Sequence, residues 1–156
     1  MRIIGIDPGT GILGFGVVDT TNGKSKLVTA GVITTPPHTP LDERLEEIFD
    51  GLTDIIAETK PDVMSVEKLF FARNVTTAMS VASARGVAIL TGRKARLPIA
   101  EYTPMQIKQS LTGYGKADKK QVQEMVRMQL GLKEIPKPDD AADALAAAIT
   151  HQMMIR

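Results

Sequence analysis

The sequence has no cysteine, so it offers neither a disulfide framework nor a thiolate zinc site. No stretch approaches the roughly 18 apolar residues of a membrane-spanning helix. Asp7 and Pro8 interrupt the region in which a signal peptide needs its apolar core. Only two histidines are present, and both His38 and His151 are expected at the surface. These absences favour a cytoplasmic protein whose site uses neither cysteine nor histidine.

A strong excess of one charge is also missing, because 19 basic residues oppose 18 acidic ones and leave a net charge of +1. The distribution is nevertheless uneven. Residues 92–137 carry 10 Lys and Arg against 4 Asp and Glu, whereas residues 1–91 carry 8 against 11 and residues 138–156 carry 1 against 3. The basic segment is either a solvated lysine-rich surface or a stripe that faces a polyanion beside an acidic site.

The size and composition suit one well-buried core. The chain has 156 residues, of which 43% are hydrophobic and 24% are charged. We find no internal repeat, low-complexity tract or linker that divides it. A single domain over residues 1–156 is therefore expected.

Hydrophobic periodicity and turn signals predict the order of the elements. The expected strands are residues 2–7, 13–19, 26–34, 63–70 and 97–102, with a hairpin turn at Asn22-Gly23. The expected helices are residues 40–59 with Thr39 as N-cap, 76–93, 104–111, 119–130 with a capping box from Asp118 to Gln121, and 139–153 with Asp139 as N-cap. This order predicts an α/β fold with a five-stranded mixed sheet flanked by helices.

Two of the predicted strands end in an acid. By the two-residue period of a strand, Asp7 shares a face with Gly5, and Glu67 shares a face with Ser65. A buried carboxylate needs a cation, a cluster of donors or a metal to offset its desolvation. The two acids converge beyond the strand ends if their strands are neighbours. The simpler alternatives are an Asx turn for Asp7 and a surface position for Glu67.

A further pair of acids lies on the last predicted helix. Asp140 and Asp143 are three residues apart and therefore point the same way. The helix dipole explains an acid at Asp140 but not one at Asp143. The alanines around them allow the helix to approach the sheet closely. Four meeting carboxylates would repel one another unless two divalent ions bridged them, and an all-oxygen donor set favours Mg²⁺, with Mn²⁺ as a substitute, over zinc.

The glycine-rich turn after the first strand is similar in sequence to two nucleotide-binding motifs. Residues 9–14 match the glycine pattern of a dinucleotide-binding loop, but a strand rather than a helix follows them. The turn also resembles the phosphate-binding hairpin of actin-like and Hsp70-like ATPases. Those proteins duplicate the domain and hold ATP between the two halves, and 156 residues with one such hairpin supply one half. Both interpretations are disfavoured.

Several motifs occur in the order and spacing of one family. They are Ile4-Gly-Ile-Asp-Pro-Gly-Thr-Gly11, Glu67-Lys-Leu-Phe70 with Asn74, Ala84-Arg-Gly86, Pro104, Lys108 and Asp140-Ala-Ala-Asp-Ala-Leu-Ala146. Over its whole length the sequence resembles the RuvC family of bacterial Holliday-junction resolvases, which have a ribonuclease-H-like fold. The resemblance implies that Asp7, Glu67, Asp140 and Asp143 are the catalytic, metal-binding acids.

The resemblance also implies an Mg²⁺-dependent homodimer that resolves four-way DNA junctions in homologous recombination and DNA repair. Paired symmetric nicks in strands of like polarity would result from two-metal-ion hydrolysis, and a branch-migration motor is an implied partner. The small side chains of helix 76–93 suit burial inside the fold or a homodimer contact. The alternatives are a nuclease for other nucleic acids, such as RNA in hybrids, and a catalytically silent junction-binding module.

The resemblance extends to the residues that contact DNA. Phe70 matches an aromatic residue that stacks near the junction crossover, while Phe71 replaces an aliphatic one, which leaves open which of the two meets DNA. Lys108 and Lys119 match basic positions near the scissile strand. Further candidates for DNA contact are Arg73, Asn74, Arg85, Lys116 and Lys120. Helix 40–59 carries seven acids on its outer side and is expected to face away from DNA.

Overall fold

The structure is a computed structural model that describes residues 1–68 and 75–155. Its sheet contains β1 (Arg2–Asp7), β2 (Ile12–Thr21), β3 (Lys24–Thr34), β4 (Val63–Glu67) and β5 (Ile99–Tyr102), in the spatial order β3-β2-β1-β4-β5. The pairs β1–β2 and β2–β3 are antiparallel, whereas β1–β4 and β4–β5 are parallel. The predicted five-stranded mixed sheet is confirmed.

The β2–β3 hairpin closes on the predicted dipeptide. Asn22 and Gly23 have φ angles of 52° and 77°, and the ladder continues to the pair Thr21 and Lys24 directly beside them. Two consecutive positive φ angles match the right-handed twist of the strands, which explains why Asn-Gly is favoured in such a turn. Both strands are longer than predicted because pairing continues through the polar residues next to the turn.

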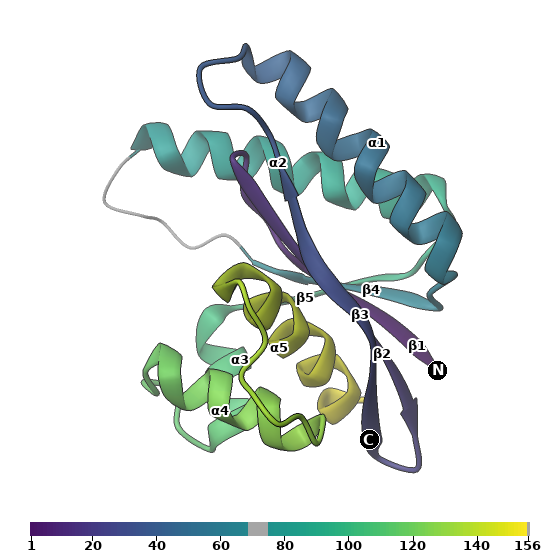
Figure 1. Cartoon of the computed structure of the whole chain (residues 1–156), viewed down its shortest axis with the longest axis vertical. Coiled ribbons are helices and arrows are strands. Elements are labelled where there is room, and N and C mark those ends of the chain that lie inside the picture. Colours follow the sequence, from purple (N-terminus) through teal and green to yellow (C-terminus); the bar gives the residue numbers. More distant parts are fainter. Residues whose placement is uncertain (69–74, 156) are drawn as a thin grey trace.

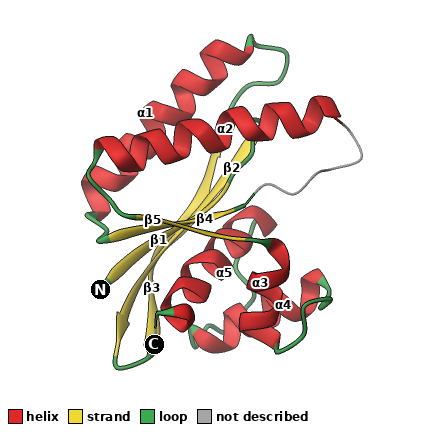
Figure 2. Cartoon of the chain, turned by 180° about the vertical axis from the view of Figure 1, so that it is seen from behind, coloured by secondary structure: helices red, strands yellow, loops and turns green. Residues whose placement is uncertain are grey.

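Helices cover both faces of the sheet (Figures 1 and 2). The helices α1 (Leu41–Thr59) and α2 (Val75–Lys94) lie on one face, and α3 (Pro104–Thr112), α4 (Lys119–Gln129) and α5 (Asp139–Met154) lie on the other. The side chains of β1 alternate between these layers. Ile4 and Ile6 join the α1–α2 cluster, whereas Ile3 joins the α3–α5 cluster. Within the described residues, no helix has the length and apolar character needed to cross a membrane.

Two helix starts differ from the prediction. The Thr39 hydroxyl donates to the Pro36 carbonyl at 2.7 Å, so Pro40 rather than Thr39 is the N-cap of α1. Asp139 is the first residue of α5 and not its N-cap, a position that Pro138 occupies. The capping box of α4 is confirmed, because Asp118 accepts from the Gln121 amide at 2.8 Å.

The predicted surface position of His151 is wrong. His151 is buried in α5, and its Nδ1 lies 2.8 Å from the Tyr102 hydroxyl of β5. Burial lowers the pKa of His151 and raises the pKa of Tyr102. The imidazole is compatible with the core because a buried hydroxyl satisfies one of its nitrogens. His38 is exposed, as predicted.

Candidate active site

Three glycines let α5 lie against the sheet at backbone contact distance. A Cβ atom at Gly5 of β1 would lie 1.9 Å from the Ala144 carbonyl oxygen, and one at Gly14 of β2 would lie 2.0 Å from the Asp140 carbonyl oxygen. At Gly16 the added atom would meet the Leu145 side chain at 2.6 Å. The predicted close approach of the alanine-rich helix is therefore confirmed, and it depends on glycines in the facing strands as much as on the alanines.

A buried hydroxyl fixes the same helix to β4. Ser65 is fully buried, and its Oγ donates to the Ala147 carbonyl oxygen at 2.7 Å. Ser65 and Glu67 lie on the same face of β4 because they are two residues apart. The strand end that carries Glu67 is thus held in register with α5.

The acids at the strand ends converge with those of α5. The pairing of Ile6 with Val66 in the parallel β1–β4 ladder places the next two residues, Asp7 and Glu67, side by side. Asp7 forms side-chain hydrogen bonds with Glu67 and with Asp140, and Asp143 interacts electrostatically with both strand-end acids. The four predicted acids therefore form one cluster.

The cluster changes how its members titrate. Burial, together with the charges of Glu67, Asp143 and Asp140, raises the pKa of Asp7 to about 9. Burial and Asp143 raise the pKa of Glu67, against the opposing effects of its hydrogen bond with Asp7 and of nearby lysines. Burial also raises the pKa of Asp143. Carboxyl groups that interact this strongly share protons, because ionising all of them together is costly.

Two of the predicted lysines lie at the cluster. Lys108 and Lys119 line a cavity of about 260 Å³ together with Glu67 and Asp143. The Lys119 Nζ lies 3.4 Å from Asp143 Oδ2 and 3.4 Å from Asp139 Oδ2. Burial lowers the pKa of Lys119, but the two aspartates outweigh this effect and raise it. Lys119 therefore stays charged and partly neutralises the acids.

The donor chemistry of the cluster suits hard divalent cations, because every side-chain donor is a carboxylate oxygen. Within residues 1–68 and 75–155, however, no three acid or histidine side chains are already arranged around a common metal position. The Lys119 ammonium group lies 3.4 Å from Asp143 Oδ2, so a divalent cation bound between the acids would compete with it for this carboxylate.

The glycine turn after β1 is fixed by protein groups. The Thr10 hydroxyl donates to the Ser80 carbonyl of α2 at 2.7 Å, and the Thr10 carbonyl accepts from Thr35 Oγ1 at 2.7 Å. Arg44 Nε in turn donates to Thr35 Oγ1 at 2.8 Å. The turn that follows Asp7 therefore connects both helices of the far layer to the strand end that carries this acid. The sequence did not predict these partners, because each contact joins residues at least nine positions apart.

The remaining predicted contact residues have different surroundings. Arg85 of α2 forms an ion pair with Glu101 of β5 at 2.5 Å, and its Nε is buried without a partner among the described residues. Lys116 and Lys120 are exposed near the start of α4. The predicted contacts Phe70, Phe71, Arg73 and Asn74 lie outside the described residues.

The fold divides the basic segment between the two ends of the sheet. Arg93, Lys94 and Arg96 precede β5, whereas Glu67 pairs with Tyr102 at the end of that strand. The lysines that follow β5, on α3, on α4 and in the loop between these helices, therefore lie at the end of the sheet that carries Glu67.

The seven acids predicted on the outside of α1 are all exposed, and α1 lies on the opposite face of the sheet from α5.

Comparisons with known proteins agree with this geometry. Residues 3–151 match the family model described as crossover junction endodeoxyribonuclease RuvC. A relative of that name from Desulforamulus reducens is 54% identical over 151 residues, which cover 97% of this chain and 93% of the relative. A solved structure of RuvC from T. thermophilus in complex with a Holliday junction substrate superposes with a TM-score of 0.94 at 40% identity, covering 100% of this chain and 95% of the other.

A more distant structural likeness concerns the fold alone. The yeast mitochondrial Holliday junction resolvase Ydc2 superposes with a TM-score of 0.65 at 13% identity, over 97% of this chain and 78% of the other. Together with the T. thermophilus structure, it confirms the predicted ribonuclease-H-like α/β fold.

Proposed function

The chain belongs to the RuvC family of crossover junction endodeoxyribonucleases, and from this membership we propose how its own residues resolve four-way DNA junctions. The observation that carries the proposal is the cluster of Asp7, Glu67, Asp140 and Asp143, in which burial and mutual repulsion raise the pKa of Asp7 to about 9. Once these carboxyl groups lose their protons, their crowded negative charges favour the binding of cations in place of the protons. The enzyme is a metal-dependent nuclease of homologous recombination and DNA repair.

We propose that the four acids hold two Mg²⁺ ions, with Mn²⁺ as a substitute. Such a pair of ions supplies an activated water and stabilises the leaving 3′ oxygen of a phosphodiester. Asp7 and Glu67 are suited to hold ions at fixed positions because they lie at the ends of two hydrogen-bonded strands. Asp140 and Asp143 complete the donor set from α5, whose position is set by its backbone contacts with β1 and β2.

Lys108 and Lys119 contribute to substrate binding in this proposal. Both line the cavity beside Glu67 and Asp143, which is where a scissile phosphate would have to lie. Metal binding would release Lys119 from Asp143, and its ammonium group would then be available to a phosphate oxygen. An ammonium group pairs with phosphate as a point charge and needs no fixed orientation.

We further propose that α2 forms a homodimer contact. Val75, Met79 and Leu90 are 71%, 68% and 56% exposed, and Ala82 and Gly86 lie between them on the same exposed stripe. A Cβ atom at Gly86 would meet no other atom within 4 Å, so a second helix can approach closely there. A symmetric dimer would present two active sites to strands of like polarity.

The dimer proposal is tested by measuring the oligomeric state. We expect Met79→Glu to shift the protein from dimer to monomer in sedimentation equilibrium. Met128→Glu, at a residue that is 59% exposed on α4, is the matched control and should remain dimeric. A branch-migration motor as partner and a cytoplasmic location remain predictions from the sequence.

Substrate choice is tested with a labelled synthetic four-way junction, a plain duplex and an RNA–DNA hybrid, each incubated with the enzyme in Mg²⁺. The proposal expects symmetric nicks in the junction and little cutting of the other two. Asp7→Asn should abolish the nicks. Equal cutting of all three substrates, or undiminished cutting by Asp7→Asn, would contradict the proposal.

A further inference from the structure

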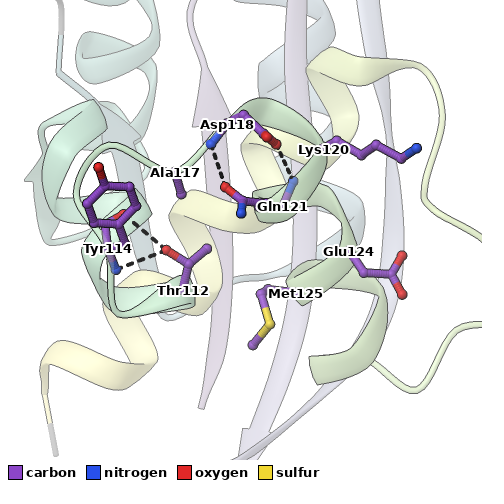
Figure 3. A pocket seen from close by; sticks show the side chains of 8 residues that line it. All are labelled: Thr112, Tyr114, Ala117, Asp118, Lys120, Gln121, Glu124 and Met125. Carbon is purple, nitrogen blue, oxygen red and sulfur yellow. Dashed lines mark hydrogen bonds between the residues drawn. The ribbon is translucent and has the colours of Figure 1, made fainter.

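A second hollow lies beside the catalytic cavity, between α4 and the loop that precedes it (Figure 3). Its volume is about 520 Å³, within the range of small-molecule and cofactor sites. Ala117 and Asp118 line both this hollow and the catalytic cavity, so the two are separated only by the start of α4. A strand whose phosphate reaches the acids would therefore have this hollow next to it.

The aromatic ring of Tyr114 stands at one side of this hollow (Figure 3). The Tyr114 amide donates to Thr112 Oγ1 at 3.1 Å, and the Tyr114 carbonyl accepts from the Ala117 amide at 3.1 Å. Gly113, with a φ of 76°, closes the preceding helix through its hydrogen bond to Gln109. These hydrogen bonds define the backbone of the loop on both sides of Tyr114. Tyr114 is nevertheless 59% exposed.

An exposed tyrosine ring on a hydrogen-bonded backbone is a low-cost binding surface, because only two side-chain torsions lose freedom when a ligand stacks on it. The thioether of Met125 forms part of the wall of the hollow and adds polarisable apolar surface. Such a surface suits the flat face of a nucleobase, and stacking of this kind tolerates any base.

The hollow has charged groups of both signs, and its exposed lysines can contact phosphates on either side of a bound base. Asp118 accepts from the Gln121 amide at the N-terminus of α4, and Glu124 forms an ion pair with Arg127 at 2.5 Å. The two carboxylates of the wall are thus engaged within the protein. Lys120, by contrast, extends outward from the rim (Figure 3), and Lys116 is exposed in the adjoining loop.

We propose that this hollow is a nucleobase subsite for the DNA strand that is cut. The Tyr114 ring stacks on an unpaired base near the scissile phosphate, while Lys116 and Lys120 contact the phosphates that flank it. The inference rests on the proposed function, since it takes the polynucleotide from the neighbouring active site. It adds an aromatic binding surface that does not belong to the acid cluster.

The test compares the junction affinity of Tyr114→Ala, Tyr114→Leu and Tyr114→Phe across a range of salt concentrations. We expect Tyr114→Ala and Tyr114→Leu to weaken binding by about 5- to 150-fold, the range of one lost stacked base, without changing the salt slope. Tyr114→Phe keeps the ring and should bind as the wild type does. Lys120→Gln should instead reduce the salt slope by about one unit.

A fluorescent base analogue placed at successive positions of the cut strand locates the stacked base. Binding of the wild type should quench the fluorescence of the analogue at one position, and binding of Tyr114→Ala should not quench it at that position. If Tyr114→Ala bound the junction with unchanged affinity and had the melting temperature of the wild type, the inference would be overturned. A hollow that binds a protein partner would give that result. Failure of the proposed function is distinct, because the wild type itself would then show no preference for the junction over duplex DNA.

Discussion

The most informative perturbation of the acid cluster is Asp7→Asn in the absence of metal. The folded-state pKa of Asp7 is raised from 3.8 to about 9. A group whose pKa is raised on folding contributes stability that is fully present below its unfolded pKa and is lost as the pH rises through its folded pKa. Wild-type protein in a chelator should therefore lose stability steadily between about pH 4 and pH 9.

The size of the loss follows from the pKa shift. From pH 3.8 to pH 7 the penalty grows by about 1.4 kcal/mol per pH unit, which gives an upper limit of about 4 kcal/mol for Asp7. Neighbouring carboxyl groups share this penalty, so we expect Asp7→Asn to be more stable than the wild type at pH 7 by about 1 kcal/mol or more. That gain corresponds to about 2–4 °C in Tm for a chain of this size.

The assay is thermal unfolding of both proteins in chelator from pH 5 to pH 9, repeated with Mg²⁺. The advantage of Asp7→Asn should grow with pH and should vanish or reverse when Mg²⁺ is present, because the ion stabilises the ionised wild-type cluster. Asp54→Asn, at an exposed position of α1, is the control and should follow the wild type. Parallel pH curves for Asp7→Asn and wild type would refute the reasoning.

Two further predictions concern the support of the site. Gly14→Ala should displace the start of α5, since its Cβ would lie 2.0 Å from the Asp140 carbonyl oxygen. We expect a loss of about 1–3 kcal/mol in urea unfolding together with loss of cleavage, whereas Gly11→Ala, whose Cβ would meet only the end of the Arg44 side chain, should unfold like the wild type. Wild-type stability of Gly14→Ala would contradict the packing. Lys119→Gln removes a charge that lowers the pKa of Glu67 and Asp143, so the acid limb of the cleavage profile should move to higher pH. Lys120→Gln should leave that limb in place, and a profile unmoved in both variants would contradict the role of Lys119.

The position of the strand-end acids could be predicted because it depends on a local regularity. The two-residue period of a strand put Asp7 and Glu67 on the faces that carry Gly5 and Ser65, and these faces do contact α5. Their convergence was conditional, because sequence alone does not say that β1 and β4 are neighbours. The parallel ladder between those two strands supplies that condition.

Other features depend on contacts between distant parts of the chain and could not be predicted. Nothing in the sequence around His151 indicated that Tyr102, 49 residues earlier, offers it a hydroxyl group. Gly14 was interpreted only as part of a turn motif and Gly16 was given no role, although the alternate spacing of these two glycines and an alanine-rich helix could together have indicated the close contact. Asp139 was assigned to helix capping, whereas its carboxylate contacts Lys119 and Gln123.

The central claim is that Asp7, Glu67, Asp140 and Asp143 carry out the chemistry of junction cleavage rather than junction binding. The most direct measurement follows binding in chelator and single-turnover cleavage in Mg²⁺, with one labelled four-way junction, for the wild type and for the four variants in which one acid is replaced by its amide. Each variant should bind at least as tightly as the wild type, since it presents less negative charge to phosphates, and should cut about 100-fold or more slowly. Cleavage at the wild-type rate by Asp7→Asn or Glu67→Gln, or a loss of binding equal to the loss of cleavage, would contradict the claim.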